Sequence, residues 1–467
     1  MKQLSKSKPR EIIDDFALEI AKAKRKGLPP TKTVIDFRNE RRDGIERDIW
    51  YVPIELLRYR KNNGRISSDV LNYEKAHGLL DERSEESQNK IEEFLKEKDK
   101  TKTDELYNSM QHEGQREEAI ITCDGFLING NRRKMVMKML SQEFPGDSRF
   151  KNMKVVILPG KSDEGGPPTI LEIEQIENRY QLQSEAKAEY YAFDRALSMR
   201  RKIELGMSLD EQLRDDPIYA GLEKKEFKNA VKKFEDEYLK PLDCIERYLA
   251  HLGREGLYST VSTGLGDPEG RWQAFLDYYK FVYQKFTDEK KRIQLGICED
   301  EIGKIEEVAF KIIRKREFPD LPKVHKIMRD FSKWLKNKDA KKELLKILDI
   351  DIALPKEERI DHNGNEYDER YIDKIWGKKY ASKIINHVKK ANDFFEHKKG
   401  QETPLKLLET ALEKLKHENM NTKNVNPFDI QKAMKLIKEI QERAGTLEDE
   451  FYHYQKDVKK LKEKYPH

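Results

Sequence analysis

Hydrophobic positions along the chain predict a small sheet region followed by a long helical region. Residues 119–122 (AIIT), 126–128 (FLI) and 155–158 (VVIL) are short apolar runs between turns, which is typical of strands. From about residue 172 onward, apolar residues recur every three or four positions, which predicts helices. We therefore expect an α+β domain with a small mixed sheet and helices, followed by a predominantly α-helical middle and C-terminal region.

One turn in the sheet region combines a glycine with arginines. Gly130 follows the FLI run and frees the backbone to turn, and Arg132 and Arg133 follow directly, at the start of a helical pattern. A helix N-terminus with guanidinium groups favours an anion, most simply a phosphate. The alternative is an ordinary strand–helix turn with solvated arginines, and the local sequence does not separate the two.

The segments around this turn follow one another in a recognisable order. VPIELL at 52–57 leads into RYRKNNGRI at 58–66, a helical segment ends in HEGQ at 112–115, and IEN stands at 176–178 after the GNRR turn. This order resembles the N-terminal domain of the ParB/sulfiredoxin superfamily, in which a position-plus-Arg box, a helix ending in Gly-Gln or Gly-Leu, a GERR-type turn and an ENxxR helix occur in sequence. The resemblance covers roughly residues 46–200.

The resemblance implies a nucleotide site. ParB-type proteins bind a cytidine nucleotide in these boxes, and relatives bind ATP or ADP, so CTP or ATP with Mg²⁺ is the implied ligand. By position, the implied nucleotide-binding residues are Arg65, Gly130, Asn131, Arg132, Arg133, Glu177, Asn178 and Arg179. No separate protein-bound metal site is predicted.

Departures from the family pattern bear on chemistry. Asn131 replaces the Glu of the GERR-type turn, which removes a carboxylate implicated in hydrolysis, and no cysteine occupies the turn, which argues against sulfinic-acid reduction. The Arg of ENxxR falls at Gln181, with Arg179 as a substitute. Three carboxylates are candidates for catalysis: Glu177, Asp124 and Glu113.

Two segments lie outside a minimal domain of this kind. The charged stretch 78–103 is expected to be a surface excursion, and PGKSDEGGPP at 159–168 is a loop by composition. Its Gly-Lys-Ser is no Walker A motif, because Val155 stands where that motif needs glycine. Lys161 remains only a minor candidate for phosphate contact.

A basic helix lies in the part of the chain where ParB-like proteins carry a helix-turn-helix. Ser208 with Glu211 forms a capping-box pattern, and the following helix has Phe227 and Phe234 on one face. As a recognition helix it would contact DNA through Lys225, Lys228, Asn229 and Lys232. The alternative, a basic-faced helix in an all-α bundle, is slightly favoured because the connection at 215–222 is long.

The remaining segments predict packing more than chemistry. The aromatic residues of 271–286 recur at helical spacing and indicate a core, and 361–369 (DHNGNEYDE) is a turn, since its glycine is misplaced for an EF-hand. Residues 370–467 predict amphipathic helices for homodimerisation or partner docking. Heptads are not sustained enough to predict a long coiled coil.

Composition sets limits on partners and location. The 92 basic and 87 acidic residues leave a net charge of only +5, so the overall balance does not indicate nucleic acid. An N-terminal basic cluster could track DNA phosphates, although carboxylates dilute it; it comprises Lys22, Lys24, Arg25, Lys26, Arg38, Arg41 and Arg42. Three scattered cysteines, no signal core and no long apolar run predict a cytoplasmic protein outside the membrane.

Three hypotheses for function follow. The first is a nucleotide-binding, ParB-like DNA-associated protein whose ligand switches DNA or partner contacts. The second is an enzyme, a nucleotide hydrolase, phosphotransferase or nuclease, that uses the same pocket. The third is a non-catalytic adaptor in plasmid maintenance or defence against mobile DNA. The expected domains are a basic helix and arm (1–45), the ParB-like domain (46–180), a helical domain (181–330) and a C-terminal helical domain (331–467).

Overall fold

The computed structural model describes residues 8–25, 31–38, 40–98, 100–182, 192–261, 271–319, 321–362, 364–422 and 425–464. Contacts within the chain divide it into two units, residues 1–395 and 396–467. No helix in these described ranges is long and apolar enough to cross a membrane. The model is mostly helical with one small mixed sheet, which agrees with the predicted α+β class at that level.

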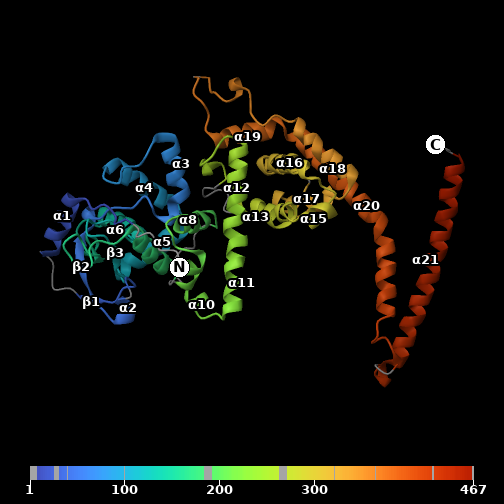
Figure 1. Ribbon diagram of the computed structural model, residues 1–467, viewed down its shortest axis with the longest axis horizontal. Coiled ribbons are helices and arrows are strands. Elements are labelled where there is room, and N and C mark those ends of the chain that lie inside the picture. The colour runs from blue at the N-terminus through green and yellow to red at the C-terminus, as the bar shows by residue number, and fades with distance from the viewer. Residues whose placement is uncertain are drawn as a thin grey trace. The chain divides into compact units, whose positions relative to one another are not determined.

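Short strands in the described part of the first unit form a single mixed sheet (Figure 1). They are β1 (Thr31–Thr33), β2 (Arg47–Pro53), β3 (Ala119–Ile121) and β4 (Asn152–Ile157), in the order β1-β2-β4-β3. β2 pairs antiparallel with β1 and β4, whereas β3 runs parallel to β4. A parallel pair needs a crossover, and helix α6 (Asn131–Glu143) supplies it.

The two faces of the sheet are both buried, because successive side chains of a strand point to opposite sides. Ala119 and Ile121 of β3 join the core that includes α6, whereas Ile120 joins a second core with Ile173 and Ile176 of α7 (Ile170–Leu182). The strands at 119–122 and 155–158 are confirmed to within two or three residues. The other helices of this region are α1 (Asp14–Arg25), α2 (Glu40–Asp43), α3 (Ser67–His77), α4 (Glu85–Glu97) and α5 (Lys100–Glu113).

Residues 126–128 do not form the expected strand of the sheet. Phe126 and Leu127 make only isolated bridges, to Arg58 and Ile121 respectively, and Ile128 donates its N–H to the carbonyl of Ile120. The segment folds back on β3 as a tight loop, which buries the apolar residues without extending the sheet.

The charged stretch 78–103 is also not the expected surface excursion. It forms α4 and the start of α5, and Ser84 caps α4 by accepting from the N–H of Ser87. Ile91, Phe94 and Leu95 are buried in the core beside α6. Three apolar residues on one face are enough to attach an otherwise charged helix to the domain.

The N-terminal segment belongs to the domain instead of preceding it. β1 is an edge strand of the sheet, and Ile20, Ile35 and Phe37 are buried in its cores. Arg38 makes an ion pair with Glu172 of α7 at 2.7 Å, which accounts for one member of the predicted basic cluster. Lys26 and the side chains of Arg25, Arg41 and Arg42 lie outside the described residues.

The rest of the first unit is helical, and one apolar core runs through it from Phe193 to Ala391. The expected boundary at residues 330 and 331 falls within α17 (Val324–Leu335). The aromatic segment 271–286 contributes Phe275 and Tyr279 to this core, as predicted. The helices are α8 (Ala192–Glu204), α9 (Leu209–Arg214), α10 (Pro217–Ala220), α11 (Lys224–Phe234), α12 (Lys240–His251), α13 (Trp272–Tyr278), α14 (Gln284–Thr287), α15 (Glu289–Gln294), α16 (Ile302–Lys315), α17 (Val324–Leu335), α18 (Lys338–Leu345) and α19 (Glu369–Lys379).

The second unit contains the end of α20 (Ala381–Leu415) and all of α21 (Ile430–Lys464). Asn426 begins the turn before α21 by accepting from the N–H of Phe428. Apolar side chains on both helices are exposed, among them Leu405, Leu412 and Ile437. Two amphipathic helices in this region agree with the sequence pattern.

Candidate functional site

A cavity of about 380 Å³ lies at the N-terminal end of α6. Its lining comes from the turn before α6, from α4 and α5, and from α7 and the 63–65 turn. Of the residues predicted to bind a nucleotide, the following line it: Arg65, Gly130, Asn131, Arg132, Arg133 and Glu177. The fold therefore brings together residues separated by more than a hundred positions in the sequence.

Gly130 shapes the turn that opens the cavity. Its φ is +87°, a conformation that side chains other than glycine rarely adopt, and a Cβ there would lie 2.7 Å from the Cβ of Ala119. Asn129 holds the turn to β3, because its Oδ1 accepts from the N–H of Ile120 at 2.7 Å. α6 consequently begins directly at Asn131, with its first N–H groups at the cavity.

The two arginines of the turn differ in their surroundings. Arg133 is partly buried, with 12% of its side chain exposed, and its Nη1 donates to the carbonyl oxygens of Glu117 and Glu118, the latter at 3.1 Å. Burial lowers the pKa of Arg133, against the opposing charges of Glu117 and Glu118, but an arginine stays protonated. Arg133 thus stabilises the loop before β3 in addition to lining the cavity, whereas Arg132 is half-buried at its wall.

Further cations come from the segment that was expected to be a surface excursion. Lys98 and Lys102 line the cavity, and so does Arg116 after α5. Lys98 also holds two carboxylates, Asp194 of α8 at 2.8 Å and Asp69 of α3 at 2.9 Å. Burial opposes the charge of Lys98, but the two carboxylates outweigh burial and raise its pKa. Sequence reasoning missed these residues, because no local motif marks them.

The wall also has an apolar part. Leu95 of α4 and Leu106 and Met110 of α5 line the cavity, together with Ile128 and Tyr180. Most ligand sites combine such apolar surface with a few placed polar groups. The arrangement suits a ligand with an anionic end and a flat, less polar end.

Glu177 lies where the cavity meets a buried ionic network. Its Oε1 accepts from the N–H of Gly64 at 3.0 Å, and its Oε2 is 3.4 Å from Nη1 of Arg60. Arg60 also binds Glu174 at 2.9 Å. Burial opposes the charge of Arg60, but Glu177 and Glu174 raise its pKa, so this pair of carboxylates is held in place by a charged guanidinium.

Asn178 and Arg179 lie away from the cavity, contrary to the prediction. Asn178 accepts from Nζ of Lys202 at 2.9 Å and donates to the carbonyl of Gln212. Arg179 binds Asp215 at 3.0 Å and Asp36 at 3.1 Å. On a helix, neighbours of Glu177 in sequence point in other directions, so these two residues attach α7 to α8 and α9 instead. The side chain of Gln181 lies outside the described residues.

Two of the three candidate catalytic carboxylates are also elsewhere. Asp124 is fully buried, binds Arg10 through both oxygens at 2.9 and 2.7 Å, and accepts from the hydroxyl of Thr122 and the N–H of Ile13. Glu113 is exposed at the end of α5 and pairs with Arg116. Neither lines the cavity, so Glu177 is the remaining candidate. Lys161 pairs with Asp14.

Comparisons with protein-family models, with curated proteins and with solved structures give no match for this chain. The resemblance drawn from the sequence therefore stays a prediction. Among the described residues, no group of three or more His, Cys, Asp or Glu side chains could hold a metal ion.

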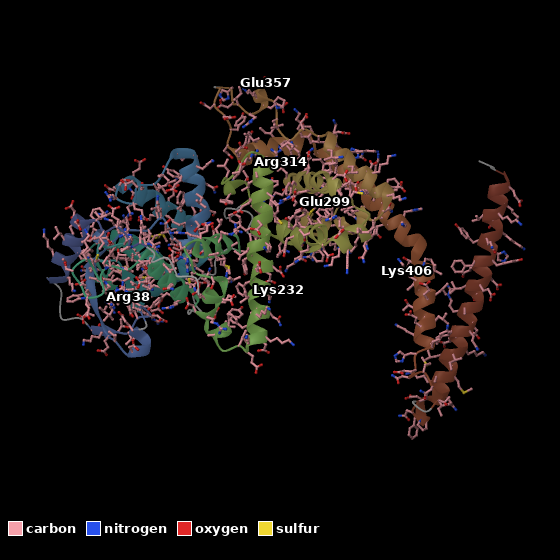
Figure 2. The ribbon with its side chains drawn as sticks, in the orientation of Figure 1. Arg38, Lys232, Glu299, Arg314, Glu357 and Lys406 are labelled. Carbon is pink, nitrogen blue, oxygen red and sulfur yellow. The ribbon has the colours of Figure 1, made fainter. Side chains whose placement is uncertain are left out.

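The basic residues predicted to contact DNA form an exposed face on α11. Lys225, Lys228, Asn229 and Lys232 are all exposed, and Figure 2 labels Lys232 on this helix. The opposite face packs through Phe227 and Phe234 against Met199, Leu209 and Leu213 of α8 and α9. The predicted capping box of Ser208 and Glu211 is confirmed at the start of α9. The four side chains share one face because they are spaced three or four residues apart.

Lys134, next to the turn, should make stability depend on pH. Its ammonium lies 3.8 Å from the ring centre of Tyr59, and burial lowers its pKa to about 7. Between pH 7 and 10 the unfolded chain therefore binds more protons than the folded chain, so stability should rise with pH, by up to about 1.4 kcal/mol per unit. Urea unfolding between pH 7 and 9.5 measures this slope.

The matched variants for that measurement are Lys134→Met and Lys138→Met. Lys134→Met removes the buried amine and should abolish the increase of stability with pH. Lys138 is partly exposed beside Glu92, so Lys138→Met should keep most of that increase. An unchanged slope in Lys134→Met would show that Lys134 stays charged in the folded protein.

Proposed function

We propose that this protein binds a nucleoside triphosphate, CTP or ATP carried with Mg²⁺, in the cavity at the start of α6. The observation that carries the proposal is the lining itself. Guanidinium and ammonium groups gather at a helix N-terminus, where N–H groups and the helix dipole favour phosphate, and an apolar wall stands beside them. The base would lie against Leu106 and Met110, and the phosphates near Arg65 and Arg132.

The proposal favours binding over hydrolysis. Asn131 supplies no carboxylate at the turn, and Asp124 and Glu113 lie outside the lining. Of the three predicted carboxylates Glu177 alone lines the cavity, and it is already engaged by Gly64 and Arg60. Glu105 and Glu117 also line the cavity, and they pair with Lys102 and Arg133 respectively. Mg²⁺ usually arrives coordinated by the phosphates and needs only one or two protein carboxylates, so its binding is compatible with this wall.

The proposal extends to DNA through the basic face of α11. Lys98 connects the cavity wall to Asp194 of α8, and Asn178 connects α7 to α9. A phosphate that competes for Lys98 would loosen its hold on α8 and shift the arrangement of α8, α9 and α11. Nucleotide binding would in this way change the affinity of the α11 face for DNA. A non-catalytic adaptor would show no such dependence on nucleotide.

The first test is calorimetry of the full chain with CTP, ATP, GTP and UTP, each with Mg²⁺. We expect one nucleotide to bind, and Arg65→Ala/Arg132→Ala to weaken it at least 100-fold, because each charged hydrogen bond contributes about 1.5–3 kcal/mol. Arg133 is left intact because it also holds the 117–118 loop.

The control variant is Arg149→Ala, an exposed arginine paired with Asp147 outside the cavity, which should bind as the wild type does. Release of inorganic phosphate in the same samples separates a switch from an enzyme.

The α11 face is tested by measuring DNA binding of the wild type and of Lys228→Gln/Lys232→Gln, each with and without the nucleotide. If none of the nucleotides binds at about 1 mM, a concentration at which a binding free energy of only ~4 kcal/mol would be detected, the proposal is contradicted and the hypothesis of a non-catalytic adaptor is favoured.

A further inference from the structure

α21 carries a heptad pattern that continues along the helix, contrary to the expectation from the sequence that heptads are not sustained. The helix runs without interruption from Ile430 to Lys464, through Gly445. Counted along this single helix, apolar residues alternate at spacings of three and four over four heptads, at positions a and d. They are Ile430, Ala433, Ile437, Ile440, Ala444, Leu447, Phe451, Tyr454 and Val458. Ala433 and Ala444 connect the larger apolar residues on either side of them into one stripe.

This stripe, which we call the α21 seam, is largely open to solvent in the single chain. Ile437 is 54% exposed, Phe451 46% and Tyr454 68%. A row of large apolar side chains on one helix face is costly in water and marks a docking surface. Apolar a and d positions sustained over this length are the signature of a coiled coil.

The other helix of the second unit is too short in its apolar part to cover the seam. The stripe of α20 comprises Leu405, Leu408, Leu412 and Leu415, about 15 Å of helix, whereas the seam spans about 42 Å. α20 precedes α21 by a short connection at 416–429, so a closed hairpin would place Leu415 near Ile430 and Leu405 near Ile440. In the same register the polar residues 396–404 (EHKKGQETP) would face 441–449. Residues 387–395, which would come next, pack Val388, Ala391 and Phe395 into the core of the first unit, so the apolar residues of 444–458 stay uncovered.

We propose that a second copy of this chain covers the seam, as a parallel and in-register pair of α21 helices. β-branched residues at a favour two parallel strands, and Ile430, Ile437 and Val458 hold three of the five a positions, beside Ala444 and Phe451, with Leu447 at d. In that register the g residue Arg443, which pairs with Glu450 at 3.1 Å within the single chain, faces the e residue Glu448 of the other copy, twice per pair. The other facing g and e positions of the described seam bring no like charges together: Leu436 faces Gln441, and Glu450 faces Gln455.

The inference does not depend on nucleotide or DNA binding. It is tested on the full chain without ligand, by sedimentation equilibrium at about 10 µM. The wild type should have twice the mass of one chain, and Ile440→Glu/Leu447→Glu should raise the dimer dissociation constant at least 100-fold. Thr446→Glu/His453→Glu adds the same charges at outward c positions and should leave the dimer intact.

Cross-linking tests the register. With exposed Cys298 replaced by serine, oxidation of Ala444→Cys should join two copies, because residues at the same a position lie side by side in a parallel pair. Asp449→Cys, at an outward f position, should not cross-link. A monomeric wild type would overturn the inference, as would equal dissociation by both glutamate pairs. A dimer that fails to cross-link at 444 would overturn the parallel register.

Discussion

Replacing Asp373 with asparagine should lower the free energy of unfolding by about 3–5 kcal/mol, because it leaves buried guanidinium groups without their shared counter-ion. Asp373 binds Arg254 at 2.8 Å, Arg271 at 2.9 Å and Arg314 at 2.7 Å, and all four residues are buried. Burial alone would raise the pKa of Asp373, but the three guanidiniums lower it to about 2. Figure 2 labels Arg314 within this helical region.

Urea unfolding followed by tryptophan fluorescence measures the loss, since Trp334 and Trp376 are buried in the same core. Asp330→Asn is the matched control: this aspartate, whose side chain is 40% exposed, pairs with Lys333 one turn along α17, and its loss should cost less than about 1 kcal/mol. A similar small cost for Asp373→Asn would mean that Glu369, which also pairs with Arg254, can neutralise the cluster alone.

The acid dependence follows from the same cluster. The pKa of Asp373 is lowered to about 2 from its ordinary value of 3.8, so its contribution to stability is complete above about pH 4. It is lost as the pH falls toward 2, where the folded-state carboxylate takes up a proton. The Asp373→Asn variant should lack this part of the acid transition.

Local features of the chain could be predicted well from the sequence. Gly130 followed by arginines and an apolar period of three to four residues predicted the turn and the start of α6, because a positive φ and helical periodicity are properties of a short segment. The capping box of Ser208 is a further example. The convergence of Arg65 and Glu177 on that turn came from the family order of the segments, not from any local signal.

What failed depends on contacts between distant segments. Asp124 stands beside the turn in sequence and looked available for catalysis, but Arg10 occupies both of its oxygens from 114 positions away. Arg179 is two residues from Glu177, yet the helix directs it to Asp36 and Asp215. Lys98 and the apolar face of α4 become part of the cavity wall only when α4 packs on the sheet domain.

The last prediction concerns the position on which the cavity depends. Gly130→Ala should destabilise the protein by about 2–5 kcal/mol: an alanine at φ +87° costs about 1–2 kcal/mol, and its Cβ would overlap that of Ala119 at 2.7 Å, which adds about 1–3 kcal/mol. The contribution of the steric overlap can be measured separately from the backbone strain, because Ala119→Gly removes the Cβ atom that the new side chain would overlap. In a double-mutant cycle, Gly130→Ala should therefore cost less in the Ala119→Gly background than in the wild type, by about 1 kcal/mol or more.

Gly146→Ala is the matched control for this cycle, since its φ is not positive and a Cβ there would meet nothing within 4 Å. Urea unfolding of the four proteins in the cycle gives the coupling, and calorimetry with the nucleotide identified for the wild type gives the effect on the site. Since the backbone strain at φ +87° remains after Ala119→Gly, the double variant should regain only part of the stability that Gly130→Ala loses. If the losses of stability in the two single variants simply add in the double variant, β3 moves aside to accept the new Cβ. The close approach of Gly130 to Ala119 would then not be what holds the N-terminus of α6 at the cavity.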